Sequence, residues 1–229
     1  KVSKPSPPIF IDNKIKTCNM LKEWVKKSGI IDIGDTMPSF AIKLTEQFSY
    51  ADYLKFPENE RWEIIDGVPY NMSPAPGTEH QYVSGELFGS IWTYLKDKAC
   101  QVFAAPFDVR FSGKKNEPDE NVETVVQPDL VVVCDEENLD KRGCNGVPDI
   151  VVEILSPSTA YKDTSEKLAL YERYGVREYW IVNPDAKYIM LYQLNGKKYS
   201  KPKYLTNADN LTSSVLTGLD IDLSSIWKE

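Results

Sequence analysis

The sequence predicts an α/β fold in which helices cover a mixed sheet. Residues 79–98, "EHQYVSGELFGSIWTYLKDK", space apolar side chains as in a helix with one apolar face. Three apolar runs follow at about 101–112, 128–134 and 149–155, and each is typical of a strand. A second helical pattern over 163–175 and one more apolar strand complete the order helix, strand, strand, strand, helix, strand.

An N-terminal extension and the first elements of the main domain precede this core. Residues 1–45 begin with a Pro- and Lys-rich stretch and contain a short amphipathic pattern, so they predict an N-terminal extension made of an extended segment and a short helix. Residues 46–229 are expected to form the main domain. Its first elements are a helix in "SYADYLKFP" that stops near Pro57 and two short strands in "RWEIIDGVPYN" around an Asp66-Gly67 turn.

The first core helix is expected to turn one set of side chains inward. This apolar face consists of Tyr82, Leu87, Ile91, Tyr94 and Leu95.

The second core helix carries signals at both of its ends. Asp163-Thr164-Ser165-Glu166 is a capping-box pattern, in which the first residue caps the helix and a glutamate follows three residues later. Gly175 is expected to end the helix. The strand "REYWIVNP" comes next, then a hairpin about Asn195-Gly196, then a last alternating strand within "LTGLDIDLSSIW".

The composition and net charge exclude some classes of protein. Among 229 residues 41% are hydrophobic, and the net charge of −7 excludes a generally basic nucleic-acid coat but not a local basic groove. No apolar run is long enough to span a membrane, so a cytoplasmic protein without a membrane partner is expected. The four cysteines lack a CxxC spacing and are expected to be reduced thiols, the alternative being a Cys134–Cys144 bridge. The single histidine removes most zinc sites.

Two Pro-Asp pairs each precede an apolar run, "PDLVVV" from Pro128 and "PDIVVEIL" from Pro148, and the second run contains Glu153. Pairing the two strands as antiparallel neighbours about the middle of their connection puts Asp129 directly across from Glu153, with Cβ atoms roughly 5 Å apart. Asp149 lies four positions from Glu153, or roughly 13 Å along the strand, so these two acids cannot share an ion. Asp149 is therefore expected to be a strand-start or turn residue.

A carboxylate in a strand that is apolar on both faces needs compensation. Two adjacent carboxylates suit Mg²⁺ or Mn²⁺, which could activate water and stabilise charge on a phosphate. A structural ion pair with a lysine and a neutral buried acid are the alternatives. Lys167, one turn after Asp163, is the lysine expected to point back toward Glu153, because helical side chains lean toward the N-terminus. An exposed Lys167 is the other interpretation, and Lys162 is a weaker competitor.

Three further polar residues are supporting candidates. His80 could contact a phosphate or a metal, or be a polar residue at a helix start. Glu86 could lie at the site or be an exposed helix residue, and Asp108 in "PFDVRF" could lie near the site on the first core strand. Glu63 and Asp66 are assigned to strand and turn structure.

The predicted hairpin mixes aromatic and basic residues, a pattern that suits a nucleic-acid strand but also a solvated hairpin. These residues are Tyr188, Tyr192, Tyr199, Lys197, Lys198, Lys201 and Lys203.

The sequence resembles the Uma family of bacterial restriction-type endonucleases, in the PD-(D/E)XK nuclease superfamily. The resemblance covers about residues 46–225 and rests on "PDLVVV", "PDIVVEILSPST", Asp163, "EKLALYERYGVREYWIVNP" and "LTGLDIDL", with "YADYLKFPENERWEIIDGVPYNMSPAPGTEHQ" as the family's usual opening.

The resemblance implies a restriction-endonuclease-like αβββαβ core, here with extra N-terminal strands and a C-terminal hairpin. It implies Asp129 and Glu153 as metal ligands and Glu86 as the acid from the first core helix. The lysine expected two residues after the glutamate is Leu155 here, and Lys167 of the neighbouring helix would replace it.

The function expected from these observations is Mg²⁺- or Mn²⁺-dependent hydrolysis of DNA phosphodiester bonds by Asp129, Glu153 and Lys167. A homodimer would suit a nuclease that addresses two strands. The alternative is a catalytically inactive protein of nuclease fold that binds nucleic acid or another protein, which the net charge and Leu155 favour.

Overall fold

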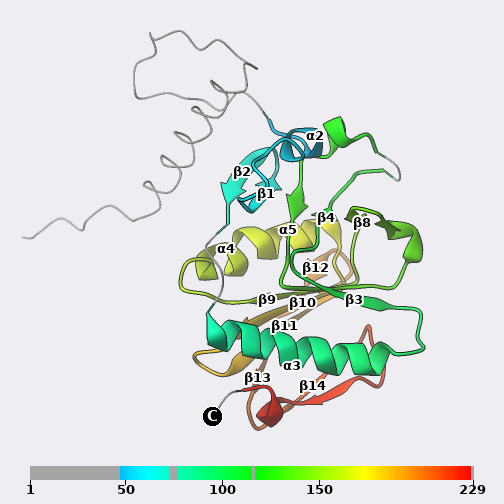
Figure 1. Cartoon of the computed structure of the whole chain (residues 1–229). Helices are drawn as coiled ribbons and strands as arrows, with labels where there is room; N and C mark the ends of the chain where they lie inside the picture. The colour runs from blue at the N-terminus through cyan, green and yellow to red at the C-terminus, as the bar shows by residue number, and fades with distance from the viewer. Residues whose placement is uncertain (1–46, 73–76, 115–116, 228–229) are drawn as a thin grey trace, which may run out of the picture. The chain divides into compact units, whose positions relative to one another are not determined.

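A computed structural model describes residues 47–72, 77–114 and 117–227 of the chain (Figure 1). The extended segment and short helix predicted within residues 1–45 lie outside the described residues.

The predicted core is present as one mixed sheet in the order β12-β11-β10-β9-β6-β3, with β13 paired to β11. Strands β9 and β10 are parallel, and the other neighbours are antiparallel. The parallel pair is joined through helices, as a parallel connection requires. The strands are β3 (Gln101–Ala104), β6 (Leu130–Val133), β9 (Ile150–Ile154), β10 (Glu178–Asn183), β11 (Tyr188–Asn195), β12 (Lys198–Tyr199) and β13 (Lys203–Thr206).

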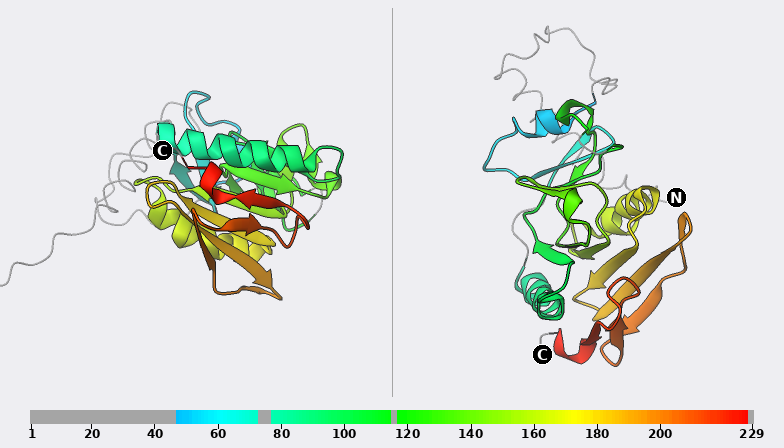
Figure 2. Two further views of the ribbon diagram at one scale, coloured as in Figure 1. Left: turned by 90° about the horizontal axis from the view of Figure 1, so that it is seen from below. Right: turned by 90° about the vertical axis from the view of Figure 1, so that its right-hand side faces the viewer.

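Helices cover both faces of this sheet. Helix α3 (Thr78–Leu95) lies on one face, and α4 (Ala160–Thr164) with α5 (Glu166–Tyr174) lies on the other, as both views of Figure 2 show. The buried stripe of α3 is Val83, Leu87, Ile91 and Leu95. Tyr82 was expected in this stripe but is 38% exposed, because the inward positions repeat every four residues from Val83.

A second sheet supports the first, in the order β2-β1-β5-β4-β8-β7. Its strands are β1 (Trp62–Ile65), β2 (Val68–Asn71), β4 (Val109–Arg110), β5 (Val125–Val126), β7 (Leu139–Asp140) and β8 (Gly143–Asn145). The predicted Asp66-Gly67 turn joins β1 to β2, with φ of 51° and 74° at its two residues. The predicted helix near residue 50 is one turn, α2 (Tyr50–Tyr53).

The apolar run 101–112 was expected to be one strand and is two, β3 in the first sheet and β4 in the second. Pro106 lies between them and has no N–H to donate to a ladder, which favours a break there. The chain therefore passes from one sheet to the other at this point.

The predicted capping box at Asp163 is wrong. Asp163 lies inside α4 and is 3% exposed, and α5 begins at Glu166 after Ser165, which makes no side-chain cap. The carboxylate of Asp163 faces Lys167 Nζ at 3.8 Å instead, and a buried acid needs such a charged partner.

The C-terminal region closes the α3 side of the core. Strands β14 (Asn210–Thr212) and β15 (Asp220–Asp222) form a two-stranded sheet, and β15 is the predicted last strand. Glu178, fully buried in β10, accepts hydrogen bonds from Ser213 Oγ at 2.8 Å and from the Ser214 N–H at 2.6 Å. The predicted Asn195-Gly196 hairpin is present between β11 and β12.

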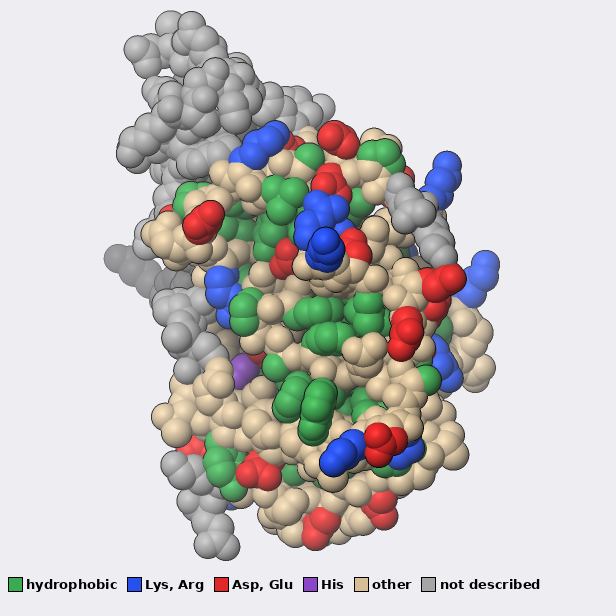
Figure 3. All heavy atoms as spheres, turned by 45° about the vertical axis from the view of Figure 1, so that its right-hand side comes forward, with side chains coloured by type: hydrophobic (Ala, Val, Ile, Leu, Met, Phe, Trp, Pro, Cys, Tyr) green, Lys and Arg blue, Asp and Glu red, His purple; other side chains and the backbone are tan. Residues whose placement is uncertain are grey.

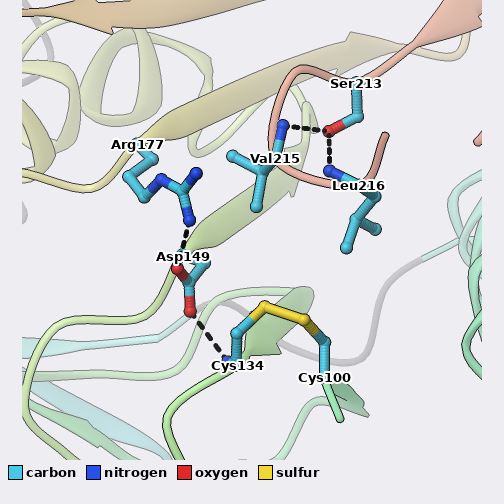
Figure 4. The surroundings of a disulfide bond; sticks show 7 residues. All are labelled: Cys100, Cys134, Asp149, Arg177, Ser213, Val215 and Leu216. Carbon is cyan, nitrogen blue, oxygen red and sulfur yellow. Dashed lines mark hydrogen bonds and ion pairs between the residues drawn. A yellow bond between two sulfur atoms is a disulfide. The ribbon is translucent and has the colours of Figure 1, made fainter. Parts of the chain in front are cut away.

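The expectation of reduced thiols fails for two cysteines, and the Cys134–Cys144 alternative is also wrong. Cys100 and Cys134 form a disulfide with a Cα–Cα distance of 3.9 Å, while Cys144 is free and buried (Figure 4). The register that pairs Gln101 with Val133 places these cysteines directly across from each other at the ends of β3 and β6. Their 34-residue separation hid this proximity in the sequence.

No helix in the described part of the chain is both long and apolar enough to cross a membrane.

Candidate active site

The two Pro-Asp strands pair in the predicted register. β6 and β9 are antiparallel neighbours, and Leu130 faces Val152 while Val131 faces Val151. The next position in this series sets Asp129 opposite Glu153. Oδ2 of Asp129 accepts a hydrogen bond from the Ile154 N–H at 2.8 Å, which holds this carboxylate against the end of β9.

Glu153 is buried among groups that donate to it. The residue is 4% exposed, and its Oε1 accepts from Lys167 Nζ and from Tyr171 Oη, both at 2.8 Å. Lys167 is the second residue of α5, so its side chain leans back toward the strand end, as predicted. The exposed interpretation of Lys167 is wrong, because the residue is 3% exposed.

Glu63 of β1 belongs to the same cluster, although its sequence pattern predicts strand structure only. Its Oε1 lies 2.8 Å from Lys167 Nζ and its Oε2 lies 2.6 Å from Lys162 Nζ. The Gln127 N–H donates to Oε1 at 3.1 Å. A signal was present in the sequence, since Glu63 interrupts the apolar run "WEII" as Glu153 interrupts "VVEIL".

Lys167 is the cation shared by these acids. It contacts Glu63 and Glu153 at 2.8 Å each, and Asp163 lies 3.8 Å away. Burial by itself lowers the pKa of Lys167, but the three surrounding carboxylates raise it well above its ordinary value. Lys167 therefore stays charged.

The two glutamates respond to this environment in opposite directions. Burial raises the pKa of Glu63, but Lys167 and Lys162 together overcome that effect and hold its pKa well below the ordinary value. Burial also raises the pKa of Glu153, and repulsion from Asp163, Asp129 and Glu63 raises it further. Lys167 lowers this pKa but does not outweigh those effects, so it stays well above the ordinary value. Glu63 is thus the ionised partner of the lysines, and Glu153 is the acid that takes up a proton more readily.

His80 connects the start of α3 to this cluster. Its Nε2 lies 3.2 Å from Oδ2 of Asp129, and its side chain is 11% exposed. In Figure 3 the purple of histidine appears only as a small area of the surface. Burial lowers the pKa of His80, while the hydrogen bond and charge of Asp129 raise it above the ordinary value overall. His80 is therefore a partner of Asp129 rather than only a polar residue at a helix start.

The remaining candidates lie outside these contacts. Asp108 accepts from Tyr50 Oη at 3.1 Å, Tyr53 Oη at 3.0 Å and Gln127 Nε2 at 2.9 Å, so among the described residues Gln127 connects it to the cluster. Glu86, half-buried on α3, forms no ion pair or hydrogen bond with the described acids of the cluster, and its role as a ligand stays a prediction.

Asp149, the aspartate of the second Pro-Asp pair, directly precedes β9, as predicted for a strand-start residue. It accepts from the Cys134 N–H at 2.8 Å and from Arg177 at 3.0 Å, beside the disulfide in Figure 4. It lies at the opposite end of β9 from Glu153.

The chemistry of the donors fits a hard divalent cation, since every acid of the cluster offers oxygen. Asp129 is the acid with an accessible side chain, 22% exposed against 2% for Glu63, 6% for Glu153 and 4% for Asp163. Within the described ranges no three His, Cys, Asp or Glu side chains surround one point as ligands would. Two carboxylates are nevertheless enough for Mg²⁺, which usually keeps several of its waters.

Comparisons with known proteins give a family and a fold for this chain. The family Uma2, described as "Putative restriction endonuclease", matches residues 50–224. A relative from Synechocystis sp. (strain ATCC 27184 / PCC 6803 / Kazusa), "Uncharacterized protein slr1290", is 26% identical over 152 residues, which are 65% of this chain and 75% of the relative.

The fold has a counterpart among solved structures. The crystal structure of "a putative nuclease belonging to DUF820" from Anabaena variabilis ATCC 29413 superposes with a TM-score of 0.63 at 17% identity. The match covers 79% of this chain and 97% of that one.

Proposed function

The chain belongs to the Uma2 family, and from that premise we propose that it is an endonuclease that uses Mg²⁺ or Mn²⁺ to hydrolyse DNA phosphodiester bonds. The observation that carries the proposal is the β6–β9 register, which sets Asp129 opposite Glu153. Nζ of the charged Lys167 lies 2.8 Å from Oε1 of Glu153, the buried member of that pair.

Each residue of the cluster has a role in this proposal. Asp129 and Glu153 would hold the cation, and the partly exposed Asp129 faces the solvent from which a phosphate would arrive. The bound ion would supply water activation and stabilise negative charge on the phosphate. Lys167 would donate to the charged phosphate oxygens in the transition state, and Glu63 would position Lys167.

The partner in this proposal is DNA. A homodimer would present two such sites to the two strands of a duplex, and light scattering of the purified protein would measure that state directly.

The test is nicking of supercoiled plasmid with Mg²⁺ or Mn²⁺, with EDTA as the metal-free control. Asp129→Asn is expected to abolish nicking and to weaken Mn²⁺ binding in calorimetry, because the variant loses a charged ligand. Asp149→Asn is the matched control from the other Pro-Asp pair and is expected to keep both properties. Equal loss in both variants would contradict the assignment of the site to Asp129.

The alternative function is a catalytically inactive nuclease fold that binds nucleic acid or protein. Leu155 in the usual lysine position favours it. Protein that binds DNA in EDTA but nicks neither DNA nor RNA with Mn²⁺ would support this alternative.

A further inference from the structure

The segment 187–206, which forms β11, β12 and β13, carries only positive charges. It contains Lys187, Lys197, Lys198, Lys201 and Lys203 and no aspartate or glutamate, in a chain whose net charge is −7. All five lysines are exposed. Among them, Lys198 pairs with Glu172 at 2.7 Å. A basic surface on an acidic protein fits a polyanionic ligand rather than another copy of the same chain.

The same segment presents tyrosine rings on the sheet face that carries Glu153. Paired positions across the sheet run from Glu153 to Ile181, from Ile181 to Met190 and from Met190 to Tyr204. Because directly paired residues point to the same side of a sheet, Tyr204 lies in the row of Glu153, three strands away. At about 4.8 Å per strand, that separation is about 14 Å.

Tyr204 is open to a ligand. It is 65% exposed, and its ring centroid lies 6.2 Å from that of half-buried Tyr188, tilted by 49°. On the same face, Tyr192 lines a shallow groove between α5 and the β11–β12 hairpin. The other lining residues are Ser165, Leu168, Ala169, Glu172, Tyr199 and Ser200. The rings and groove thus form a surface that leads from α5 to the edge strand β13.

We propose that this surface, defined by Tyr188, Tyr192, Tyr204 and the hairpin lysines Lys197, Lys198 and Lys201, binds single-stranded nucleic acid next to the catalytic cluster. Bases stack on the exposed ring of Tyr204 and against the half-buried rings beside it, and the lysines neutralise the phosphates. Single strands are favoured over duplex because only unpaired bases offer their faces to a ring. The assignment of the bound strand as the flank of the cleaved bond rests on the proposed nuclease function.

Binding is measured without metal so that cleavage plays no part. The probe is a fluorescein-labelled oligothymidylate in EDTA, followed by fluorescence anisotropy and compared with a duplex of equal length. Tyr204→Ala is expected to weaken binding of the single strand about tenfold or more, because one stacking platform is removed. Tyr204→Phe should bind as the wild type does, since the ring remains.

Trp92→Ala is the matched control for an exposed aromatic residue. Trp92 is 58% exposed on α3, which covers the opposite sheet face, so its removal should leave the affinity unchanged. Equal losses in the Tyr204 and Trp92 variants, or tighter binding of duplex than of single strand, would overturn the proposal.

The lysines are tested through salt dependence. Replacing Lys197 and Lys201 by alanine should reduce the slope of log Kd against log salt by about 0.7 for each phosphate that the variant no longer neutralises. Each single replacement is compared with Lys96→Ala, which also removes one positive charge, at the end of α3, and should leave the slope as it is.

The two proposals can fail separately. Tyr204-dependent binding without any nicking would preserve this surface and remove the nuclease function. Nicking that is unaffected by Tyr204→Ala, together with unchanged binding of the single strand, would preserve the nuclease function and remove this surface.

Discussion

Glu63 of β1 and Lys167 of α5 form a buried ion pair, with Oε1 and Nζ 2.8 Å apart. The pair joins the second sheet to the helix that covers the first. Lys167 is also the ion-pair partner of Glu153, so Glu63 and Glu153 share one cation. We therefore expect replacement of Glu63 and replacement of Glu153 to change the stability of the protein in different ways.

Glu153→Gln should leave the metal-free protein as stable as the wild type or raise its melting temperature by about 2–4 °C. The reason is that burial and three neighbouring acids disfavour an ionised Glu153, as its raised pKa indicates. Lys167 keeps Glu63 as a partner in this variant. Calorimetric unfolding in EDTA measures the effect. A large loss of stability would show that Glu153 acts mainly as a structural ion-pair partner.

Glu63→Gln should have the opposite effect and cost about 3–5 kcal/mol of unfolding free energy, because breaking a buried pair leaves charge uncompensated. Its lowered pKa indicates that two lysines stabilise the ionised form. Urea unfolding of the two glutamine variants side by side provides the comparison. Equal stability of both variants would contradict the difference assigned to them here.

The pH dependence of stability should separate the same two residues. The folded-state pKa of Glu153 is raised above its unfolded value of about 4.3, so the wild type loses stability relative to Glu153→Gln as pH rises above that value. Below about pH 4 the two proteins should melt alike, because the carboxyl is neutral in both states. The folded-state pKa of Glu63 is lowered, so its contribution is complete above about pH 4.3 and is lost as pH falls. Melting curves in EDTA from pH 3 to 8 test both signs.

Lys167→Ala should reduce metal-dependent nicking about a hundredfold or more, because a donor to the charged phosphate is removed. It also leaves buried acids without their shared cation, so the rate is compared at a temperature where circular dichroism shows a folded variant. Lys162→Ala removes the other partner of Glu63 and should reduce nicking much less. Equal losses of nicking in the Lys167 and Lys162 variants would contradict a direct role of Lys167. They would indicate instead that both variants act through the loss of an ion pair with Glu63.

Loss of the Cys100–Cys134 disulfide should lower the unfolding free energy by about 3–4 kcal/mol, given its 34-residue separation. Cys100→Ser therefore melts below the wild type, and dithiothreitol lowers the melting temperature of the wild type but not of the variant. Peptide mapping without reductant should recover Cys100 and Cys134 as one cross-linked pair. Alkylation of both residues without reductant would contradict the disulfide.

Local pattern determined much of the fold. Apolar periodicity indicates the helix of residues 78–95 and the strands around Val131, Val151 and Ile181, because each element must bury one or both faces. The β6–β9 register also follows from the sequence, since a connection of known length between two antiparallel strands leaves one alignment that pairs both apolar runs. Asp129 and Glu153 can be located in this way from the sequence alone.

The tertiary structure decided what surrounds those acids. Glu63 reaches Lys167 because a second sheet packs behind α5, and no local pattern encodes the distance between two sheets. For the same reason the sequence predicts a cap at Asp163 and free thiols at Cys100 and Cys134. Asp163 can serve either a cap or an ion pair, and two cysteines can stay free or form a disulfide, and only the packed chain brings the deciding partner within reach.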